Sequence, residues 1–206
     1  MKPTSWRVLA CKGCGSAIVE AAFALAELPY ERVEIDYESP AGKAALLEHN
    51  PLAQVPTVIA PDGLVLSESA ALVQIIDELA PHAGLLPAAG DPLRRDALRW
   101  LTFCVAAIYP TFTYGDNPAK WGAGEPLKAA TNAHREALWR HLDGVARKPW
   151  FLGARMSALD IYIGVMANWR PGRAWFEAHA PKLDAIARAV AREPRLAEVW
   201  RTNGFD

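Results

Sequence analysis

The sequence predicts a mixed α/β domain followed by an all-helical domain. Up to about residue 79, segments with strand periodicity alternate with segments with helix periodicity. Prolines and glycines then interrupt every period between residues 83 and 92, as in a linker. Beyond this linker only helical periodicity remains. We therefore expect one domain over residues 1–82 and a second over 93–206.

The first domain is expected to follow the order β-α-β-α-β-β-α. Its helical segments carry Ala, Leu, Ile and Val at helical spacing, whereas residues 30–37 alternate apolar and acidic side chains, as in a strand with one exposed face. Pro61-Asp62-Gly63 predicts a hairpin turn, so the sheet gains an antiparallel edge. The predicted strands cover residues 6–10, 30–37, 57–60 and 64–66, and the predicted helices cover 16–27, 41–49 and 68–79.

The second domain is expected to be a helical bundle. Ser157-Ala158-Leu159-Asp160 has the pattern of a capping box, which serves folding and not chemistry. Cys104 lies inside an apolar helical segment and is expected in the core. Helices are predicted over residues 93–108, 125–145, 157–168 and 181–192, with a terminal turn over 194–201.

The composition is that of an ordinary globular protein, with 51% apolar and 22% charged residues. No apolar run approaches the ~20 residues that span a bilayer, and the N-terminal apolar stretch is too short for a signal peptide. We therefore expect a cytoplasmic protein without a membrane partner. Residues 1–82 hold five Lys or Arg against eleven Asp or Glu. The basic residues of the second half are interspersed with acids, so no nucleic-acid partner is expected.

The stretch Cys11-Lys12-Gly13-Cys14 lies between a predicted strand and a predicted helix. A C-x-x-C pair in this place suggests a dithiol redox site. Zinc would need two more ligands, and the sequence has neither a second cysteine pair nor a close histidine pair, so no metal is expected. Ser16 follows at the predicted start of the helix and offers a hydroxyl instead. Either kind of side chain could carry chemistry here.

Two further motifs resemble the glutathione transferase superfamily. They are Asn50-Pro51-Leu52-Ala53-Gln54-Val55-Pro56-Thr57-Val58 and Leu66-Ser67-Glu68-Ser69-Ala70-Ala71. The resemblance covers essentially the whole chain, and Gly15-Ser16-Ala17 and Tyr109-Pro110-Thr111-Phe112-Thr113-Tyr114 are similar to a bacterial branch of that family. It implies a thioredoxin-like first domain that binds glutathione, an all-helical second domain that forms the pocket for a small apolar electrophile, and a homodimer.

The resemblance also implies that glutathione is held by Gln54, Val55, Glu68 and Ser69. In the family the Val-Pro bond is cis, and the residue before the proline pairs with glutathione as a short added strand. The residues alone leave a trans proline on an edge strand open. Glu68 and Ser69 begin a helix whose N-terminus could hold a carboxylate beside an ammonium group, although plain N-capping is the alternative. Gln54 is expected to reach the glycyl end or to face solvent.

The catalytic role is assigned to Ser16, with Cys14 as the rival. Lowering the pKa of a thiol by about two units takes roughly 2.7 kcal/mol. A hydrogen bond to a charged group supplies ~1.5–3 kcal/mol, so a serine hydroxyl at a helix N-terminus suffices to activate glutathione. Cys14 could instead form a mixed disulfide with glutathione. Against that, Cys11 and Cys14 fall about two residues before the position of a glutaredoxin-type pair.

Three hypotheses for the function remain. The first is a glutathione transferase that uses glutathione as co-substrate without a metal. The second is a glutathione-dependent thiol–disulfide oxidoreductase using Cys14, and the third is a non-catalytic relative that keeps the fold as a binding module. For the electrophile pocket, the candidates are aromatic residues of the second domain, with a core position as the alternative for each. They are Tyr109, Phe112, Tyr114 and Trp169.

Overall fold

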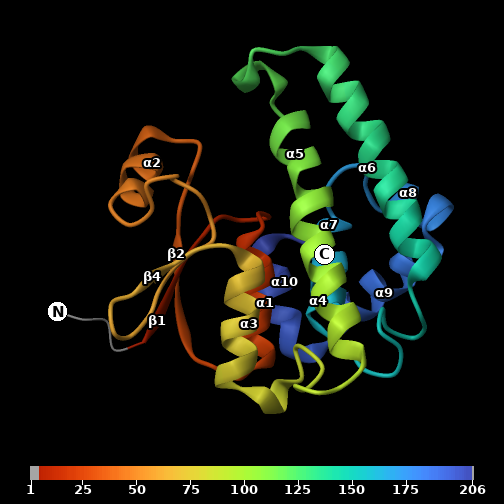
Figure 1. The fold of residues 1–206 in the computed structure, drawn as a ribbon. Helices are drawn as coiled ribbons and strands as arrows, with labels where there is room; N and C mark the ends of the chain where they lie inside the picture. The colour runs from red at the N-terminus through yellow and green to blue at the C-terminus, as the bar shows by residue number, and fades with distance from the viewer. Residues whose placement is uncertain (1–4, 206) are drawn as a thin grey trace. The chain divides into compact units, whose positions relative to one another are not determined.

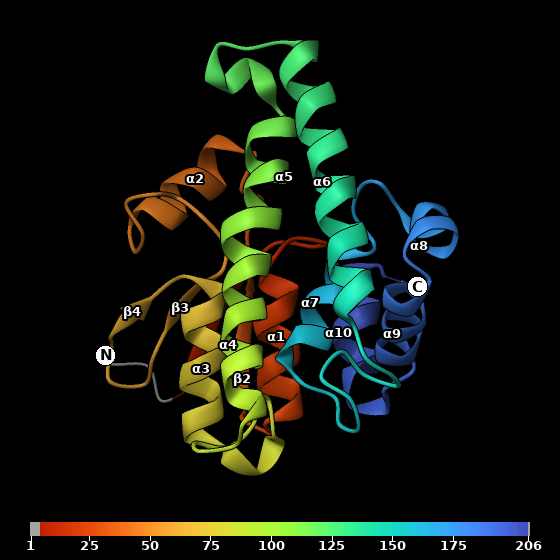
Figure 2. The same cartoon turned by 45° about the vertical axis from the view of Figure 1, so that its right-hand side comes forward.

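The computed structural model describes residues 5–205 (Figures 1 and 2). The first unit holds a four-stranded sheet in the order β2-β1-β3-β4. β1 and β2 are parallel, with a helix between them in the chain, whereas β3 is antiparallel to both β1 and β4. The strands are β1 (Trp6–Ala10), β2 (Tyr30–Glu34), β3 (Thr57–Ile59) and β4 (Val65–Leu66).

Three helices complete the first unit in the predicted βαβαββα order. They are α1 (Ser16–Leu25), α2 (Pro40–Leu47) and α3 (Ser69–Leu79). α1 is buried along nearly its whole length because it packs against β1, α3 and the last helix of the chain. The thioredoxin-like fold expected from the sequence is therefore confirmed.

The register of the strands brings three loops to one edge of the sheet. Leu9, near the end of β1, pairs with Thr57 at the start of β3. Leu66, at the end of β4, pairs with Val58. The segment after β1, the segment before β3 and the segment after β4 therefore leave the sheet at the same edge. All the site residues predicted in the first domain belong to these three segments.

The second unit is helical, as predicted. α4 and the π-helical turn Cys104–Ile108 cover the helix expected over 93–108, and the helix then continues into α5, which was not expected. α8, which lies between two of the predicted helices, was not expected either. The helices are α4 (Leu93–Phe103), α5 (Tyr109–Gly115), α6 (Glu125–Val145), α7 (Ala158–Met166), α8 (Arg173–His179) and α9 (Pro181–Ala191).

The end of the chain packs with the first unit. The two compact units are Met1–Leu86 together with Ala189–Asp206, and Pro87–Arg188. α10 (Ala197–Asn203) packs against α1. The division expected from the sequence put all of 93–206 in one helical domain. Periodicity shows that a segment is an amphipathic helix, but it does not show which apolar surface the helix covers.

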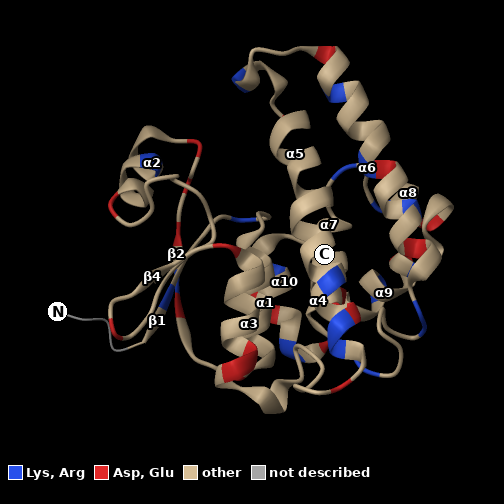
Figure 3. Ribbon diagram, in the orientation of Figure 1, with Lys and Arg blue, Asp and Glu red and all other residues tan. Residues whose placement is uncertain are grey.

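Basic and acidic residues are interspersed along α6 (Figure 3). On α6, Lys128 pairs with Glu125 and Arg140 pairs with Glu136, each within one turn. Within residues 5–205, no helix combines the length and the apolar character needed to cross a membrane.

Candidate functional site

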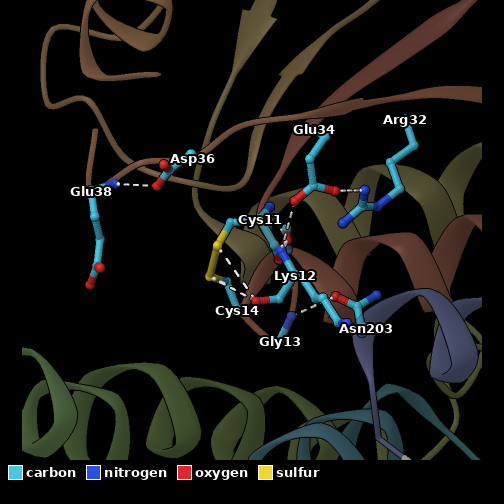
Figure 4. Close-up of a disulfide and its surroundings, with 10 residues drawn as sticks. Cys11, Lys12, Gly13, Cys14, Arg32, Glu34, Asp36, Glu38 and Asn203 are labelled. Carbon is cyan, nitrogen blue, oxygen red and sulfur yellow. Dashed lines mark hydrogen bonds and ion pairs between the residues drawn. A yellow bond between two sulfur atoms is a disulfide. The ribbon is translucent and has the colours of Figure 1, made fainter. Parts of the chain in front are cut away.

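The loop after β1 closes a tight turn that pairs two cysteines. The Cys14 N–H donates to the Cys11 carbonyl at 3.2 Å, and Gly13 adopts a φ of +73°, which glycine reaches without the steric cost of a side chain. The turn brings the two Cα atoms to 5.4 Å, and Cys11 and Cys14 form a disulfide (Figure 4). Both cysteines are partly exposed. The two cysteines of the C-x-x-C motif are therefore bonded to each other.

Three side chains from different elements hold this loop. They come from α1, β2 and α10, and each accepts a hydrogen bond from a main-chain N–H of the loop; Figure 4 labels Glu34 and Asn203 among them. The bonds are Cys11 N to Ser16 Oγ at 3.2 Å, Lys12 N to Glu34 Oε1 at 3.2 Å, and Gly13 N to Asn203 Oδ1 at 3.0 Å.

Ser16 is the first residue of α1, as predicted, but it is fully buried. Its hydroxyl accepts from the Cys11 N–H and donates to the Cys11 carbonyl, both at 3.2 Å. A hydrogen bond from this hydroxyl to a bound thiolate would have to replace the bond to the Cys11 carbonyl. The structure thus shows a loop-holding contact for Ser16, whereas a role in catalysis stays a prediction.

The segment before β3 is fixed by a buried polar pair that the sequence did not single out. The Asn50 side-chain amide donates to Thr57 Oγ1 at 2.9 Å, and Thr57 Oγ1 donates to the Gln54 carbonyl at 2.7 Å. Both side chains are buried, so these bonds satisfy groups that would otherwise be costly. Asn50 begins the motif Asn50–Val58, and this motif was the only feature of the sequence that pointed to the segment.

Val55 is fixed by its side chain, whereas its main chain makes no hydrogen bond within residues 5–205. Its side chain packs against the core cluster of Leu9, Ile35, Leu46 and Ile59, and the Val55-Pro56 bond is cis. Among residues 5–205, no hydrogen bond to the main chain of Val55 is found. Its N–H and C=O are thus available for an added strand. The neighbouring Gln54 side chain is exposed.

The third loop leads into the N-terminus of α3. Glu68 is its N-cap, with a φ of +67° that non-glycine residues rarely adopt and a side chain that makes no capping bond. Such strained positions cluster at functional sites. Ser69 is the first residue of the helix and is partly buried, whereas Glu68 is exposed. A helix N-terminus beside a carboxylate suits a ligand with a carboxylate next to an ammonium group.

A buried ion pair lies beneath the cysteine loop. Glu20 on α1 is fully buried and accepts from Arg32 on β2 at 2.7 Å. Burial raises the pKa of Glu20, while Arg32, Asn203 and Ser16 act in the opposite direction. The burial of Glu20 could not be predicted from the sequence pattern, because that pattern does not show that α10 packs against α1.

The second unit brings together three of the four predicted pocket aromatics. The ring centroid of Trp169 lies 5.6 Å from that of Tyr109 and 5.2 Å from that of Phe112, and both contacts are edge-on. The ring of Tyr114 contacts that of Trp121, with their centroids 4.8 Å apart. Phe112 is buried, and the guanidinium of Arg135 lies 3.8 Å from its ring centroid, so one nominee is a core residue.

No group of three or more potential metal ligands occurs within the described part of the chain. The buried Cys104 is a single thiol whose pKa is raised to about 12 by burial. It is therefore a core residue, as predicted.

Comparisons with known proteins show the family to which the chain belongs. Residues 16–79 match the family model of the glutathione S-transferase N-terminal domain. An uncharacterized GST-like protein, YncG of Escherichia coli strain K12, is 34% identical over 203 residues, which is 96% of this chain and 98% of that protein. Glutathione transferase GST 23 of Zea mays is 34% identical over 159 residues, covering 74% of this chain and 66% of that protein.

Solved structures share the fold over nearly the whole chain. A ternary complex of BphK, a bacterial GST, has a TM-score of 0.83 at 26% identity and covers 96% of this chain and 99% of that one. A sphingomonad glutathione S-transferase complexed with glutathione has a TM-score of 0.82 at 26% identity and covers 97% and 100%. The sequence identity to YncG over the whole length and the shared fold show that this chain belongs to the glutathione transferase superfamily.

Proposed function

We propose that this protein is a glutathione transferase that binds glutathione at the edge of the sheet and activates its thiol for attack on a small apolar electrophile. One observation carries the proposal: the strand register brings the cysteine loop, Val55 and the start of α3 to the same edge. A tripeptide that pairs with Val55 lies between the N-termini of two helices. The sphingomonad relative, complexed with glutathione, supports this ligand.

Each end of glutathione has a complementary group in this arrangement. The N–H and C=O of Val55 pair with the extended main chain of the cysteinyl residue. The N-terminus of α3 and Ser69 bind the γ-glutamyl carboxylate, and Glu68 binds the neighbouring ammonium. Gln54, exposed just before Val55, binds the glycyl end. The thiol then lies towards the N-terminus of α1, where the helix dipole and the Ser16 hydroxyl favour a thiolate.

The expected acceptor is an apolar electrophile held by aromatic side chains such as Tyr109 and Trp169. The proposal includes a cytoplasmic location, a homodimer and no metal. The 34% sequence identity to YncG over 96% of this chain supports membership of this family. The structural likeness to BphK supports a fold with both domains.

Binding and catalysis are tested separately. Retention on immobilised glutathione and isothermal titration test the binding site, with Glu78→Gln, on the exposed face of α3, as the control for Glu68→Gln. Conjugation of an aryl halide then tests the transfer. A protein that fails to bind glutathione at all would be the non-catalytic relative, and the proposal would be wrong.

A second candidate function is thiol–disulfide exchange between glutathione and Cys14. The observation that favours it is exposure: both cysteines are partly exposed, while Ser16 is fully buried. An assay with an aryl halide and a small disulfide, run on wild type, Ser16→Ala and Cys14→Ser, separates the two. Loss of conjugation in Ser16→Ala supports the transferase. Loss of disulfide reduction in Cys14→Ser supports the exchange reaction.

A further inference from the structure

The Cys11–Cys14 loop has every main-chain N–H of its four residues hydrogen-bonded. One bond closes the turn itself, and three go to side chains from α1, β2 and α10. The loop is thus held in shape by contacts that do not depend on the sulfur–sulfur bond. A thiol pair in such a loop would stay at bonding distance after reduction.

The disulfide is poorly suited to stabilising the fold. It closes a ring of only four residues, and the stabilisation from a disulfide decreases as the closed loop shortens. The backbone that it joins is already fixed by hydrogen bonds. Its sulfur atoms lie beside the Lys12 carbonyl in a partly exposed loop and not within the core. These features are those of a bond that forms and breaks in use.

We propose that Cys11 and Cys14 form a redox-active dithiol–disulfide couple that exchanges electrons with small thiols and disulfides, and that Asn203 is its positioning residue. The attacking thiol is Cys14, which lies two residues before the first residue of α1 and benefits from the positive end of its dipole. Cys11 is the resolving thiol. This centre uses both cysteines, so it differs from a single cysteine that forms a mixed disulfide with glutathione.

The reaction balances in two exchange steps. A small thiolate attacks Cys14 Sγ, forms a mixed disulfide and releases Cys11 as a thiolate, which takes up a proton. A second thiolate attacks the sulfur of the bound small molecule, releases Cys14 and forms the small disulfide. Two thiols are oxidised and one protein disulfide is reduced, and the reverse sequence reduces a small disulfide substrate.

Asn203 connects the end of the chain to this centre. Its Oδ1 accepts from the Gly13 N–H at 3.0 Å, and its amide donates to the Val199 carbonyl of α10 at 3.0 Å. Asn203 is buried, so both bonds are shielded from water. The contact fixes the glycine whose positive φ closes the turn. Losing it loosens the turn and disfavours the disulfide relative to the dithiol.

The first experiment is a redox titration of the full-length wild type. The protein is equilibrated at graded ratios of reduced to oxidised dithiothreitol, alkylated, and analysed by mass spectrometry of its peptides. We expect Cys11 and Cys14 to become modified together in one two-electron transition of the folded protein, while the buried Cys104 stays unmodified. A disulfide that opens only on unfolding, or two cysteines modified at every ratio, would overturn the proposal.

The second experiment measures the same equilibrium constant in variants. Asn203→Ala is expected to shift it towards the dithiol by about threefold to tenfold, the effect of one buried hydrogen bond. Thr202→Ala on the same helix, whose hydroxyl donates to the exposed Glu198, is the matched control and is expected to leave the constant unchanged. If Asn203→Ala does not fold, Glu34→Ala removes the exposed acceptor of the Lys12 N–H and is expected to shift the constant in the same direction.

An equilibrium constant is a readout that a purely structural contact would not move. If Asn203→Ala or Glu34→Ala lowers the unfolding temperature but leaves the constant at its wild-type value, the positioning role is wrong. Using dithiothreitol makes the couple independent of glutathione binding. The redox couple does not rest on the proposed function, so a protein that titrates but does not bind immobilised glutathione would disprove that function alone.

Discussion

At the scale of single residues, Glu68 combines an unfavourable backbone with an exposed carboxylate. Its φ of +67° costs a non-glycine residue about 1–3 kcal/mol. No capping bond of its own side chain offsets this cost. The proposed ammonium contact of glutathione gives a reason for placing an acid here.

Glu68→Gly is therefore expected to separate stability from binding. Relief of the strain is opposed by the entropy of glycine, roughly 1 kcal/mol, so the free energy of unfolding should stay within about 1 kcal/mol of wild type. The affinity for glutathione should fall about tenfold or more, because a charge-assisted hydrogen bond is lost. Chemical denaturation and isothermal titration measure the two effects. Unchanged affinity would remove Glu68 from the site.

Ser16→Ala separates the observed contact of Ser16 with the loop from its proposed role in activating glutathione. Removing the hydroxyl leaves the part-buried N–H of Cys11 without its acceptor and takes one of two donors from the Cys11 carbonyl, so the free energy of unfolding is expected to fall by about 1–3 kcal/mol. If Ser16 also activates glutathione, kcat for conjugation falls and the pH profile of the activity moves to higher pH. A variant that is less stable but keeps the wild-type activity and pH profile would have lost only a loop contact.

At the scale of elements, the start of α7 shows the predicted capping box. Asp160 Oδ2 accepts from the Ser157 N–H at 2.7 Å and from its hydroxyl at 2.9 Å, and Asp160 Oδ1 accepts from the Phe151 N–H at 2.7 Å. The spacing in the sequence predicted the box. The bond to Phe151 was not predictable, because it comes from a loop that only folding brings there.

The pKa of Asp160 makes this element sensitive to pH. Burial raises the pKa from its usual 3.8 to about 6, against the opposing hydrogen bonds from Phe151 and Ser157. The folded state therefore binds the proton more tightly than the unfolded state. This contribution to stability is complete below about pH 3.8 and is lost as the pH rises through about 6.

Asp160→Asn removes this titration. Between pH 4 and pH 7, the wild type is expected to lose roughly 3 kcal/mol of unfolding free energy relative to the variant, the equivalent of a shift of about two pKa units. Urea denaturation of both proteins at a series of pH values measures the difference. A difference that is constant across this range would mean that burial does not raise the pKa of Asp160.

At the scale of the whole molecule, the return of the C-terminal segment to the first unit is the main departure from the expected organisation. Trp200 of α10 is 4% exposed and its ring lies 5.7 Å from that of Phe205. α10 covers α1, which carries the buried Glu20 and Ser16. The last residues of the chain thus stabilise the unit that holds the proposed site.

Trp200→Ala is expected to lower the free energy of unfolding by about 3–5 kcal/mol, as is typical of a buried tryptophan. The adjacent Arg201→Ala is the matched control, since Arg201 is 70% exposed and pairs with the exposed Glu198. It should change the stability by less than about 0.5 kcal/mol. Equal effects in the two variants would show that α10 does not pack as described.

The sequence predicted the chain order of the elements in the first domain and the residues of the candidate site. Alternating periodicity predicted the βαβαββα order, and the motifs around Val55 and Glu68 belong to loops that the register brings to one edge. These features are local: a period, a turn or a cap is set by residues within a few positions of one another. The same locality placed Ser16 at the start of α1.

Only the tertiary structure decided what surrounds these residues. The burial of Ser16 and Glu20, the Asn50–Thr57 pair and the contact of Asn203 with Gly13 each depend on packing between distant segments. Gly13 and Asn203 lie 190 residues apart in the chain, and no periodic pattern records such a pairing. The sequence alone therefore predicted two cysteines before a helix. Only the fold showed how the loop that carries them is held, because contacts with residues far along the chain fix its geometry.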